Sequence, residues 1–232
     1  MDTSMSFSFK FKQHTVNAML FDLDGTLLDT AADLGAAANA LLSRDGLELL
    51  SDDTIFHTAS QGALALIKAG YGHALSEDDY QRLRQEFLDY YENNVATHSR
   101  YFGGCEQLLN QLNDQKIPWG IVTNKPYFYT KQLLNSFPLL ATTHVTVCGD
   151  TMRERKPSPA PLILAAKSLA IEPQQIIYVG DARTDIEAAT SAKMHSVAAN
   201  YGYIPHQDPC HEWQADMIVD RCDELCDLLT NS

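Results

Sequence analysis

The stretch Met19-Leu20-Phe21-Asp22-Leu23-Asp24-Gly25-Thr26-Leu27-Leu28-Asp29 decides how the rest of the chain is interpreted. Its first residues end an apolar run from Val16, and such a run predicts a buried strand. Side chains along a strand repeat with period two, so Asp22 and Asp24 should leave the strand end in the same direction. Two carboxylates this close repel each other unless a cation lies between them or one holds a proton. Taken alone, the motif is better explained as an ordinary Asp-Gly turn.

The composition limits both the fold and the partners. The chain has 232 residues, of which 45% are hydrophobic and 20% charged, and this suits one large domain or a core with a smaller module. The net charge of -13 disfavours a nucleic-acid surface. An anionic substrate would have to be attracted by local positive charge or by a metal. No apolar stretch approaches the roughly 18 residues of a membrane span, so we expect no membrane association.

Residues 6–12 alternate between aromatic and polar side chains. They lack the continuous apolar segment of a signal peptide. The alternation predicts a short added strand or extended arm, with Phe7, Phe9 and Phe11 on one face.

The five cysteines are an odd number without the spacing of a disulfide framework. This indicates a reduced, cytoplasmic protein. Cys210 and His211 could form a zinc site with Cys222 and Cys226, but no C-x2-C pair supports one, and we do not expect it.

Residues 31–97 show only helical patterns. A helix is predicted to begin after Thr30 as N-cap, and further helices are predicted near 51–57, 61–69 (closed by Gly70) and 76–91. With no strand between them, these helices suggest an inserted cap. From Tyr101 the pattern alternates, which predicts a parallel sheet with helices on both faces. The expected strands are 119–123, 145–148, 176–179, 196–199 and 217–219, and the expected helices are 105–115, 129–137, 160–169, 184–192 and 223–229.

These patterns predict an α/β fold. Its core would be a Rossmann-like, doubly wound parallel sheet formed by residues 1–30 and 98–232. Residues 31–97 would form an all-helical cap domain inserted into that core.

Polar residues follow four of the predicted strands, where ligands bind in open parallel sheets. Each has an ordinary explanation as a turn or capping residue, but their common register at strand ends is harder to explain by chance. The set suits phosphoryl transfer, with a carboxylate nucleophile, further acids to hold Mg2+, and a hydroxyl and a lysine to bind phosphoryl oxygens. The residues are Asp22, Asp24, Thr123, Asn124, Lys156, Asp181 and Asp185.

Four motifs resemble those of the haloacid dehalogenase (HAD) superfamily, in the branch of phosphoglycolate phosphatase-like enzymes. They are Phe21-Asp-Leu-Asp-Gly-Thr-Leu27, Val122-Thr-Asn-Lys-Pro126, Arg155-Lys-Pro-Ser-Pro159 and Val179-Gly-Asp-Ala-Arg-Thr-Asp185. The resemblance implies a Mg2+-dependent phosphatase that hydrolyses a small phosphate monoester, with 2-phosphoglycolate as the first candidate. The alternatives are N-acetylmuramic acid 6-phosphate or another sugar phosphate, and a phosphomutase.

The resemblance also implies roles for single residues. Asp22 would be the nucleophile, and Asp24 the general acid and then the base. Thr123 and Lys156 would bind phosphoryl oxygens. Mg2+ would be held by Asp22, the backbone carbonyl of Asp24, and Asp181, with Asp185 as a direct or water-mediated partner.

The remaining expected contacts surround the substrate. Gly25 would permit the turn and Thr26 would hydrogen-bond within it, while Asn124 would orient the site. The cap segment Ser60, Gln61 and Gly62 would meet the substrate, and Asp29 would mark the exit toward the cap.

The expected partner is a small phosphorylated metabolite, bound by a monomer or homodimer. A receiver-like signalling module, phosphorylated on aspartate, is the alternative from another class. It is disfavoured because receivers have no helical insertion after the first strand and do not need Asp24.

Overall fold

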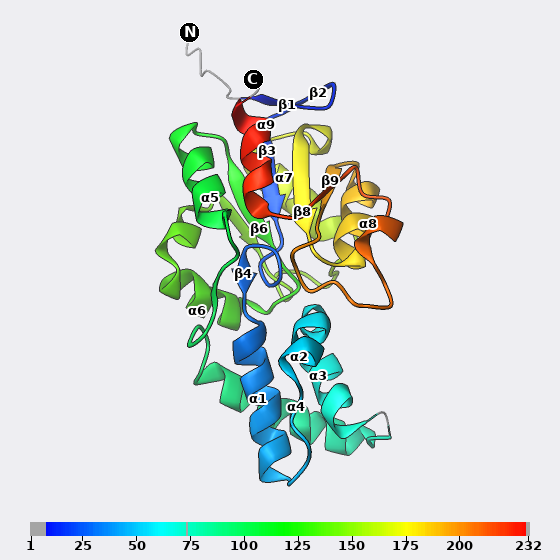
Figure 1. The fold of residues 1–232 in the computed structure, drawn as a ribbon. Helices are drawn as coiled ribbons and strands as arrows, with labels where there is room; N and C mark the ends of the chain where they lie inside the picture. The colour runs from blue at the N-terminus through cyan, green and yellow to red at the C-terminus, as the bar shows by residue number, and fades with distance from the viewer. Residues whose placement is uncertain (1–7, 73, 231–232) are drawn as a thin grey trace.

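A six-stranded parallel sheet forms the centre of the larger lobe (Figure 1). The computed structural model describes residues 8–72 and 74–230, so Phe7 lies outside the described residues. In sheet order the strands are β10 (Met217–Val219), β9 (His195–Ala199), β8 (Ile176–Gly180), β3 (Ala18–Phe21), β6 (Trp119–Val122) and β7 (Val145–Val147). The chain runs from β3 to β6 on one side and later returns to β8 on the other. The carboxyl end of β3 is therefore a topological switch point, where open sheets bind ligands.

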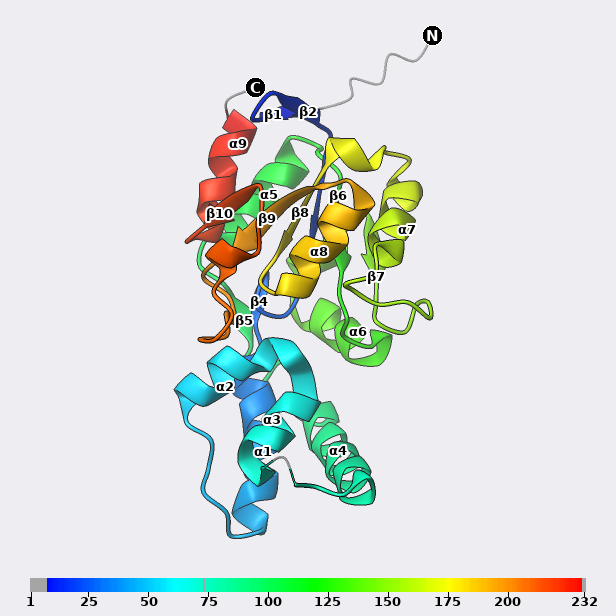
Figure 2. The same ribbon diagram turned by 90° about the vertical axis from the view of Figure 1, so that its right-hand side faces the viewer.

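Helices cover both faces of this sheet, as the strand–helix alternation predicts (Figure 2). Met19 and Phe21 of β3 pack in one apolar cluster, and Ala18 and Leu20 pack in a second cluster on the opposite face. This alternation follows from the period of two along a strand. The first face carries α5 (Cys105–Asp114), α6 (Tyr127–Ser136) and α9 (Cys226–Thr230), and the second carries α7 (Ala160–Leu169) and α8 (Arg183–Ala192).

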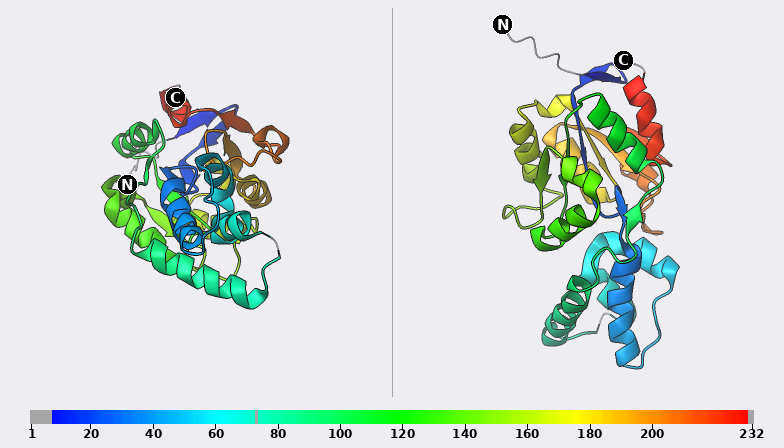
Figure 3. Two further views of the ribbon diagram at one scale, coloured as in Figure 1. Left: turned by 60° about the horizontal axis from the view of Figure 1, so that its bottom comes forward. Right: turned by 90° about the vertical axis from the view of Figure 1, so that its left-hand side faces the viewer.

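A helical lobe lies beyond the carboxyl ends of the strands (Figures 1 and 3). It consists of α1 (Ala31–Arg44), α2 (Asp52–Thr58), α3 (Gly62–Tyr71) and α4 (Glu77–Glu92). Its apolar side chains form a cluster of their own, in which Leu83, Phe87 and Tyr91 of α4 are fully buried.

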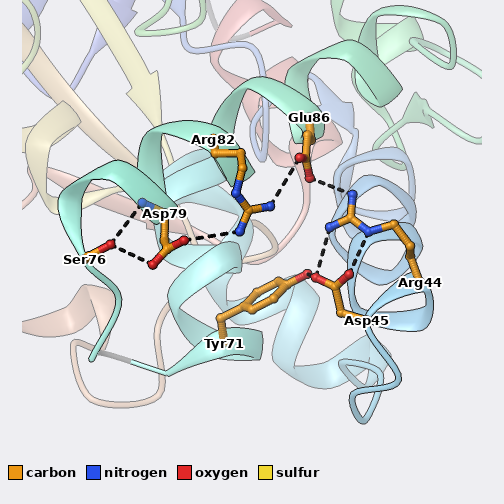
Figure 4. A network of polar contacts seen from close by, with 7 residues as sticks. All are labelled: Arg44, Asp45, Tyr71, Ser76, Asp79, Arg82 and Glu86. Atoms are coloured by element: carbon orange, nitrogen blue, oxygen red, sulfur yellow. Dashed lines mark hydrogen bonds and ion pairs between the residues drawn. The ribbon is translucent and has the colours of Figure 1, made fainter.

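An exposed polar network joins three helices of this lobe (Figure 4). Arg44 at the end of α1 pairs with Glu86 of α4, and Asp45 accepts a hydrogen bond from the Tyr71 hydroxyl of α3. Exposed ion pairs of this kind contribute little individually, so the apolar cluster carries most of the stability of the lobe.

Two short antiparallel strands, β4 (Leu28–Asp29) and β5 (Arg100–Tyr101), carry the chain into and out of the helical lobe. At the other end of the sheet, β1 (Phe9–Phe11) pairs with β2 (His14–Val16), and Phe9 and Phe11 are buried in the first apolar cluster. Among the described residues, no helix is both long and apolar enough to cross a membrane. The 3-10 segments are η1 (Ala59–Gln61), η2 (Pro138–Thr142), η3 (Pro173–Gln175), η4 (Cys210–Glu212) and η5 (Cys222–Leu225).

Two local predictions were wrong. The side chain of Thr30 does not cap α1, because its hydroxyl donates to Asp24 Oδ1 at 2.6 Å. Gly70 does not end α3, which continues to Tyr71. A Cβ at Gly70 would lie 2.7 Å from the Leu42 methyl carbons, so this glycine permits close packing of α3 on α1. In addition, the expected helix 223–229 is divided into η5 and α9.

Candidate active site

The predicted polar residues lie together at the carboxyl edge of the sheet. Asp22 follows the central strand β3. Thr123 follows β6 and Asp181 follows β8, and these two strands flank β3 in the sheet. Lys156 comes from the loop after β7, and its ammonium group lies 2.9 Å from Asp22 Oδ1. The same ammonium lies 2.6 Å from Asp185 Oδ1 on the first turn of α8. Two carboxylates from separate elements thus share one lysine.

Lys156 is almost completely buried, and a tyrosine that sequence reasoning missed completes its surroundings. Its ammonium donates to the Tyr178 hydroxyl at 2.8 Å, and that hydroxyl lies 2.8 Å from the Val122 carbonyl oxygen. Burial acts to lower the pKa of Lys156, but the carboxylates of Asp185 and Asp22 outweigh it and raise the pKa to about 12. The lysine therefore remains charged across the physiological range.

Three carboxylates form a cluster that could hold a divalent cation. One oxygen from each of Asp22, Asp181 and Asp185 lies within 4.8 Å of the others. Burial, countered in part by Lys156, raises the pKa of Asp22 to about 6. Burial and then the neighbouring carboxylates raise the pKa of Asp181 well above its ordinary value.

The donor set of this cluster fits a hard cation. Asp22 Oδ1 is buried without an aligned hydrogen-bond donor, although the Lys156 ammonium is close enough for an ion pair. Carboxylate oxygens are the ligands that hard divalent cations prefer. A cation at this point would also offset the burial and the repulsion between carboxylates that together raise the two pKa values.

Asp24 has different partners from Asp22. Its Oδ1 accepts from the Thr30 hydroxyl at 2.6 Å and lies 3.0 Å from the Lys125 ammonium. The Lys125 side chain is only 8% exposed, and its ammonium lies 4.9 Å from the ring centre of Tyr91 in α4. Burial opposes the charge on Lys125, but Asp24 and Tyr91 raise its pKa above the usual value.

Lys125 is the main site residue that sequence reasoning missed. It stands inside the motif Val122–Pro126, directly after the two residues that were predicted to act. A lysine is rarely buried unless it is paired, but burial of this lysine could not be inferred from its position in the motif.

The turn after β3 positions Asp181. Gly25 has a φ of +86°, and a Cβ there would lie 2.1 Å from Asp181 Oδ2. Thr26 is fully buried, and its hydroxyl donates to Asp181 Oδ1 at 2.8 Å. The Tyr203 backbone N–H donates to the other carboxylate oxygen at 3.1 Å. Gly25 thus permits the turn and Thr26 hydrogen-bonds to the carboxylate cluster. Neither residue is among those that line the cavity, and their part in substrate binding stays a prediction.

The side chains of Asn124 and Thr123 make different hydrogen bonds. The Asn124 side chain donates to the Lys156 carbonyl and accepts from the Lys156 backbone N–H, both at 3.1 Å. It therefore fixes the backbone of Lys156, although it also lines the cavity. The Thr123 hydroxyl accepts from the Lys125 backbone N–H at 3.1 Å, which leaves its own hydrogen available for a ligand.

A cavity of about 620 Å³ lies between these residues and the helical lobe. Its floor includes Asp22, Asp24 and Thr123, and the segment Ser60-Gln61-Gly62 before α3 lines its wall. Four cationic side chains line it beside three carboxylates (Asp22, Asp24 and Asp208), so the lining lacks the negative excess of the chain as a whole. These cations are Arg84, Lys125, Arg155 and Arg183.

Comparison with known proteins identifies related chains. The family model described as haloacid dehalogenase-like hydrolase matches residues 19–199. The N-acetylmuramic acid 6-phosphate phosphatase of Pseudomonas aeruginosa is 38% identical over 219 residues, which cover 94% of this chain and 96% of that protein. The phosphoglycolate phosphatase of Xanthomonas campestris is 40% identical over 208 residues, which cover 90% and 94%.

A solved structure has a similar fold. The crystal structure of a predicted phosphoglycolate phosphatase from Haemophilus somnus superimposes with a TM-score of 0.80 at 28% identity, and the match covers 91% of this chain and 97% of that one.

Proposed function

The chain belongs to the family of haloacid dehalogenase-like hydrolases, and from that premise we propose that it hydrolyses a small phosphate monoester through an aspartyl phosphate on Asp22. The observation that carries this proposal is that the two aspartates contact different side chains. Asp22 faces Lys156 and the carboxylate cluster, whereas Asp24 faces Lys125 and the Thr30 hydroxyl. One carboxylate is thus placed to attack and the other to move a proton.

In the first step, a carboxylate oxygen of Asp22 attacks phosphorus and the bond to the alkoxide oxygen breaks. Asp24 donates its proton to that leaving oxygen. Lys156 and the Thr123 hydroxyl bind phosphoryl oxygens, where negative charge spreads in the transition state.

In the second step, Asp24 acts as a base. It takes a proton from a water molecule, whose oxygen attacks phosphorus and releases inorganic phosphate and the free Asp22 carboxylate. The step restores the proton on Asp24, so the cycle balances without an outside acid.

We assign the metal role to Asp22, the backbone carbonyl of Asp24, and Asp181, with Asp185 directly or through water. When bound, Mg2+ would neutralise charge between the carboxylates and the phosphoryl group. The support for this role is the cluster of carboxylate oxygens and the unaligned Asp22 Oδ1.

Residues 31–97 act as the cap in this proposal, and residues 1–30 and 98–232 act as the core. The helical lobe supplies Ser60, Gln61 and Arg84 to the cavity wall, opposite the sheet edge. A cap of this kind excludes water from the reacting groups and selects the leaving group.

Two substrates are supported by the names of the relatives. These are 2-phosphoglycolate and N-acetylmuramic acid 6-phosphate, and identities of 40% and 38% do not separate them. Both carry a carboxylate besides the phosphoryl group, which suits the Arg84 and Arg155 side chains on the cavity wall.

One observation favours the larger substrate. The cavity of about 620 Å³ has the size that drug-sized ligands occupy, about 300–1,000 Å³. Tyr80 and Tyr129 are half-buried on its wall and supply aromatic surface on which a sugar ring can pack. 2-Phosphoglycolate would leave most of this space to water.

The test is phosphate release from a panel of phosphorylated metabolites that includes both candidates and several other sugar phosphates. We expect release that EDTA abolishes and Mg2+ restores, with the higher kcat/KM for the amino-sugar phosphate. A higher kcat/KM for 2-phosphoglycolate would return it to first place. Activity in excess EDTA would contradict the metal assignment, and a requirement for a sugar bisphosphate primer would favour a phosphomutase.

A further inference from the structure

Two histidines and an aspartate meet where α2 faces the loop that follows β9. Asp53 and His57 stand four residues apart, on one face of α2, and His206 belongs to the loop after β9. One ligand atom from each of the three lies within 4.8 Å of the others. None of the three lines the cavity that contains Asp22. The cluster therefore joins the helical lobe to the sheet lobe outside the candidate active site, in the region where the two lobes approach one another in Figures 1 and 2.

A backbone carbonyl fixes the protonation pattern of His57. Its Nδ1 lies 2.6 Å from the carbonyl oxygen of Ile204, in the same loop as His206. Because a carbonyl oxygen only accepts, Nδ1 must carry the hydrogen, and the neutral ring then presents a lone pair on Nε2. Histidines that ligate metals are commonly held in this way, with the other ring N–H donated to a carbonyl or carboxylate.

The lone pair on His57 Nε2 faces a carboxylate. Asp53 Oδ1 lies 3.5 Å from it, and Asp53 Oδ2 lies 3.4 Å from His206 Nε2. Two acceptors that face each other repel, and a cation between them converts the repulsion into coordination. Ligands about 2.0 Å from a tetrahedral Zn2+ lie about 3.3 Å from one another. The two separations between Asp53 and the histidines, each through a different carboxylate oxygen, are close to this value.

The surroundings admit an ion from solvent. The side chains of Asp53 and His206 are 72% and 60% exposed, and that of His57 is 27% exposed. The His57 and His206 rings are neighbours, with centroids 3.8 Å apart and ring planes tilted by 39°. Imidazole nitrogen favours Zn2+, Ni2+ and Cu2+ over Mg2+, which prefers oxygen ligands.

We propose that Asp53, His57 and His206 form a second metal site, which binds a transition-metal dication such as Zn2+ with water in the open position. It connects α2 of the helical lobe to the loop after β9. The five cysteines are all buried, so thiolates at the surface do not compete for the ion.

The test is an isothermal titration calorimetry experiment in which Zn2+ is added to untagged protein in saturating Mg2+. The variants His57→Gln, His206→Asn and Asp53→Asn each remove one ligand, and Asp53 and His206 are exposed enough for the fold to tolerate the change. His98→Asn is the matched control, because His98 is also exposed but stands outside the cluster.

We expect one Zn2+ whose affinity falls at least tenfold in each of the three variants and is unchanged in His98→Asn. Dependence on both His57 and His206 is the result that shows a site shared by the two lobes. Parent protein without such a site, or a His206→Asn variant that binds Zn2+ as tightly as the parent, would overturn the proposal. Because the readout is binding in the presence of Mg2+, it is independent of phosphatase activity.

Discussion

The ammonium group of Lys125 lies 3.0 Å from Asp24 Oδ1, on a side chain that is almost fully buried. The two aspartates therefore have different cationic partners, because Asp22 pairs with Lys156 instead. The ion pair with Lys125 also connects Asp24 to the helical lobe, because the same ammonium lies over the Tyr91 ring. Lys125 therefore contacts both the proposed general acid and α4 of the helical lobe.

Lys125→Met should slow turnover. Hydrogen bonds to charged groups contribute about 1.5–3 kcal/mol, which corresponds to a loss of about 10- to 100-fold in kcat if the pair orients Asp24 in the transition state. Steady-state kinetics on the best substrate of the panel would measure the loss. The control is Lys131→Met, which removes an exposed lysine from α6. A kcat equal to that of the control would remove Lys125 from this role.

Asp22→Asn should stabilise the protein when metal is absent. The pKa of Asp22 is raised from 3.8 to about 6, chiefly by burial, so the folded state binds this proton more tightly than the unfolded state. The stability from the protonated form is complete below pH 3.8 and is lost as the pH rises through about 6. At about 1.4 kcal/mol per unit, ionised Asp22 costs about 3 kcal/mol above pH 6.

Urea unfolding in EDTA at several pH values would measure this effect. We expect the variant to exceed the parent by about 3 kcal/mol at pH 7.5 and to match it near pH 3.5. Mg2+ should then raise the Tm of the parent more than that of the variant, because the variant lacks one carboxylate ligand. Equal unfolding free energies of variant and parent at pH 7.5 would show that burial of the ionised Asp22 carboxylate does not destabilise the fold.

The fold was largely predictable because its signals are local. The apolar runs and the helical spacing predicted the order of strands and helices along the chain. The motifs placed Asp22, Thr123 and Asp181 directly after strands and Lys156 before the helix that follows the next strand. These residues converge because carboxyl ends of parallel strands share one edge. The domain boundaries and the roles of these residues remain predictions.

The contacts that depend on distant partners could not be predicted. Thr30 looked like an N-cap by residue type, but the start of α1 is bound by the hydroxyl of Tyr203, which is 173 residues away in the chain. That contact frees the Thr30 hydroxyl for Asp24. The pairing of Lys125 with Asp24 also could not be predicted from the sequence, because it depends on how the loop after β6 is placed relative to the end of β3.

Tyr203→Phe should destabilise the protein through this contact. The hydroxyl accepts from the backbone N–H groups of Thr30 and Ala31 at 2.6 and 2.9 Å and donates to Asp29. Phenylalanine keeps the ring but removes the acceptor of the Thr30 N–H and leaves the Ala31 N–H only a long bond to Asp29 Oδ1 at 3.4 Å, at a cost of about 1–3 kcal/mol. Thermal unfolding would detect the loss, with Tyr90→Phe at an exposed position of α4 as control. Equal Tm values for the two variants would contradict the capping role.

Asp24→Asn should reveal the proton transfer through its dependence on the leaving group. An alkoxide leaves poorly without a proton, so turnover of the alkyl phosphate substrate should fall by about 10²–10⁴-fold, the usual contribution of a general acid. A nitrophenolate leaves without assistance, so formation of the phosphoenzyme from p-nitrophenyl phosphate should fall much less. Because Asp24 also acts as the base, the phosphoenzyme should then accumulate, and rapid acid quenching with labelled substrate would detect it. A variant that slows both substrates equally in the first step would place Asp24 in a structural role, since only a general acid distinguishes leaving groups by their need for a proton.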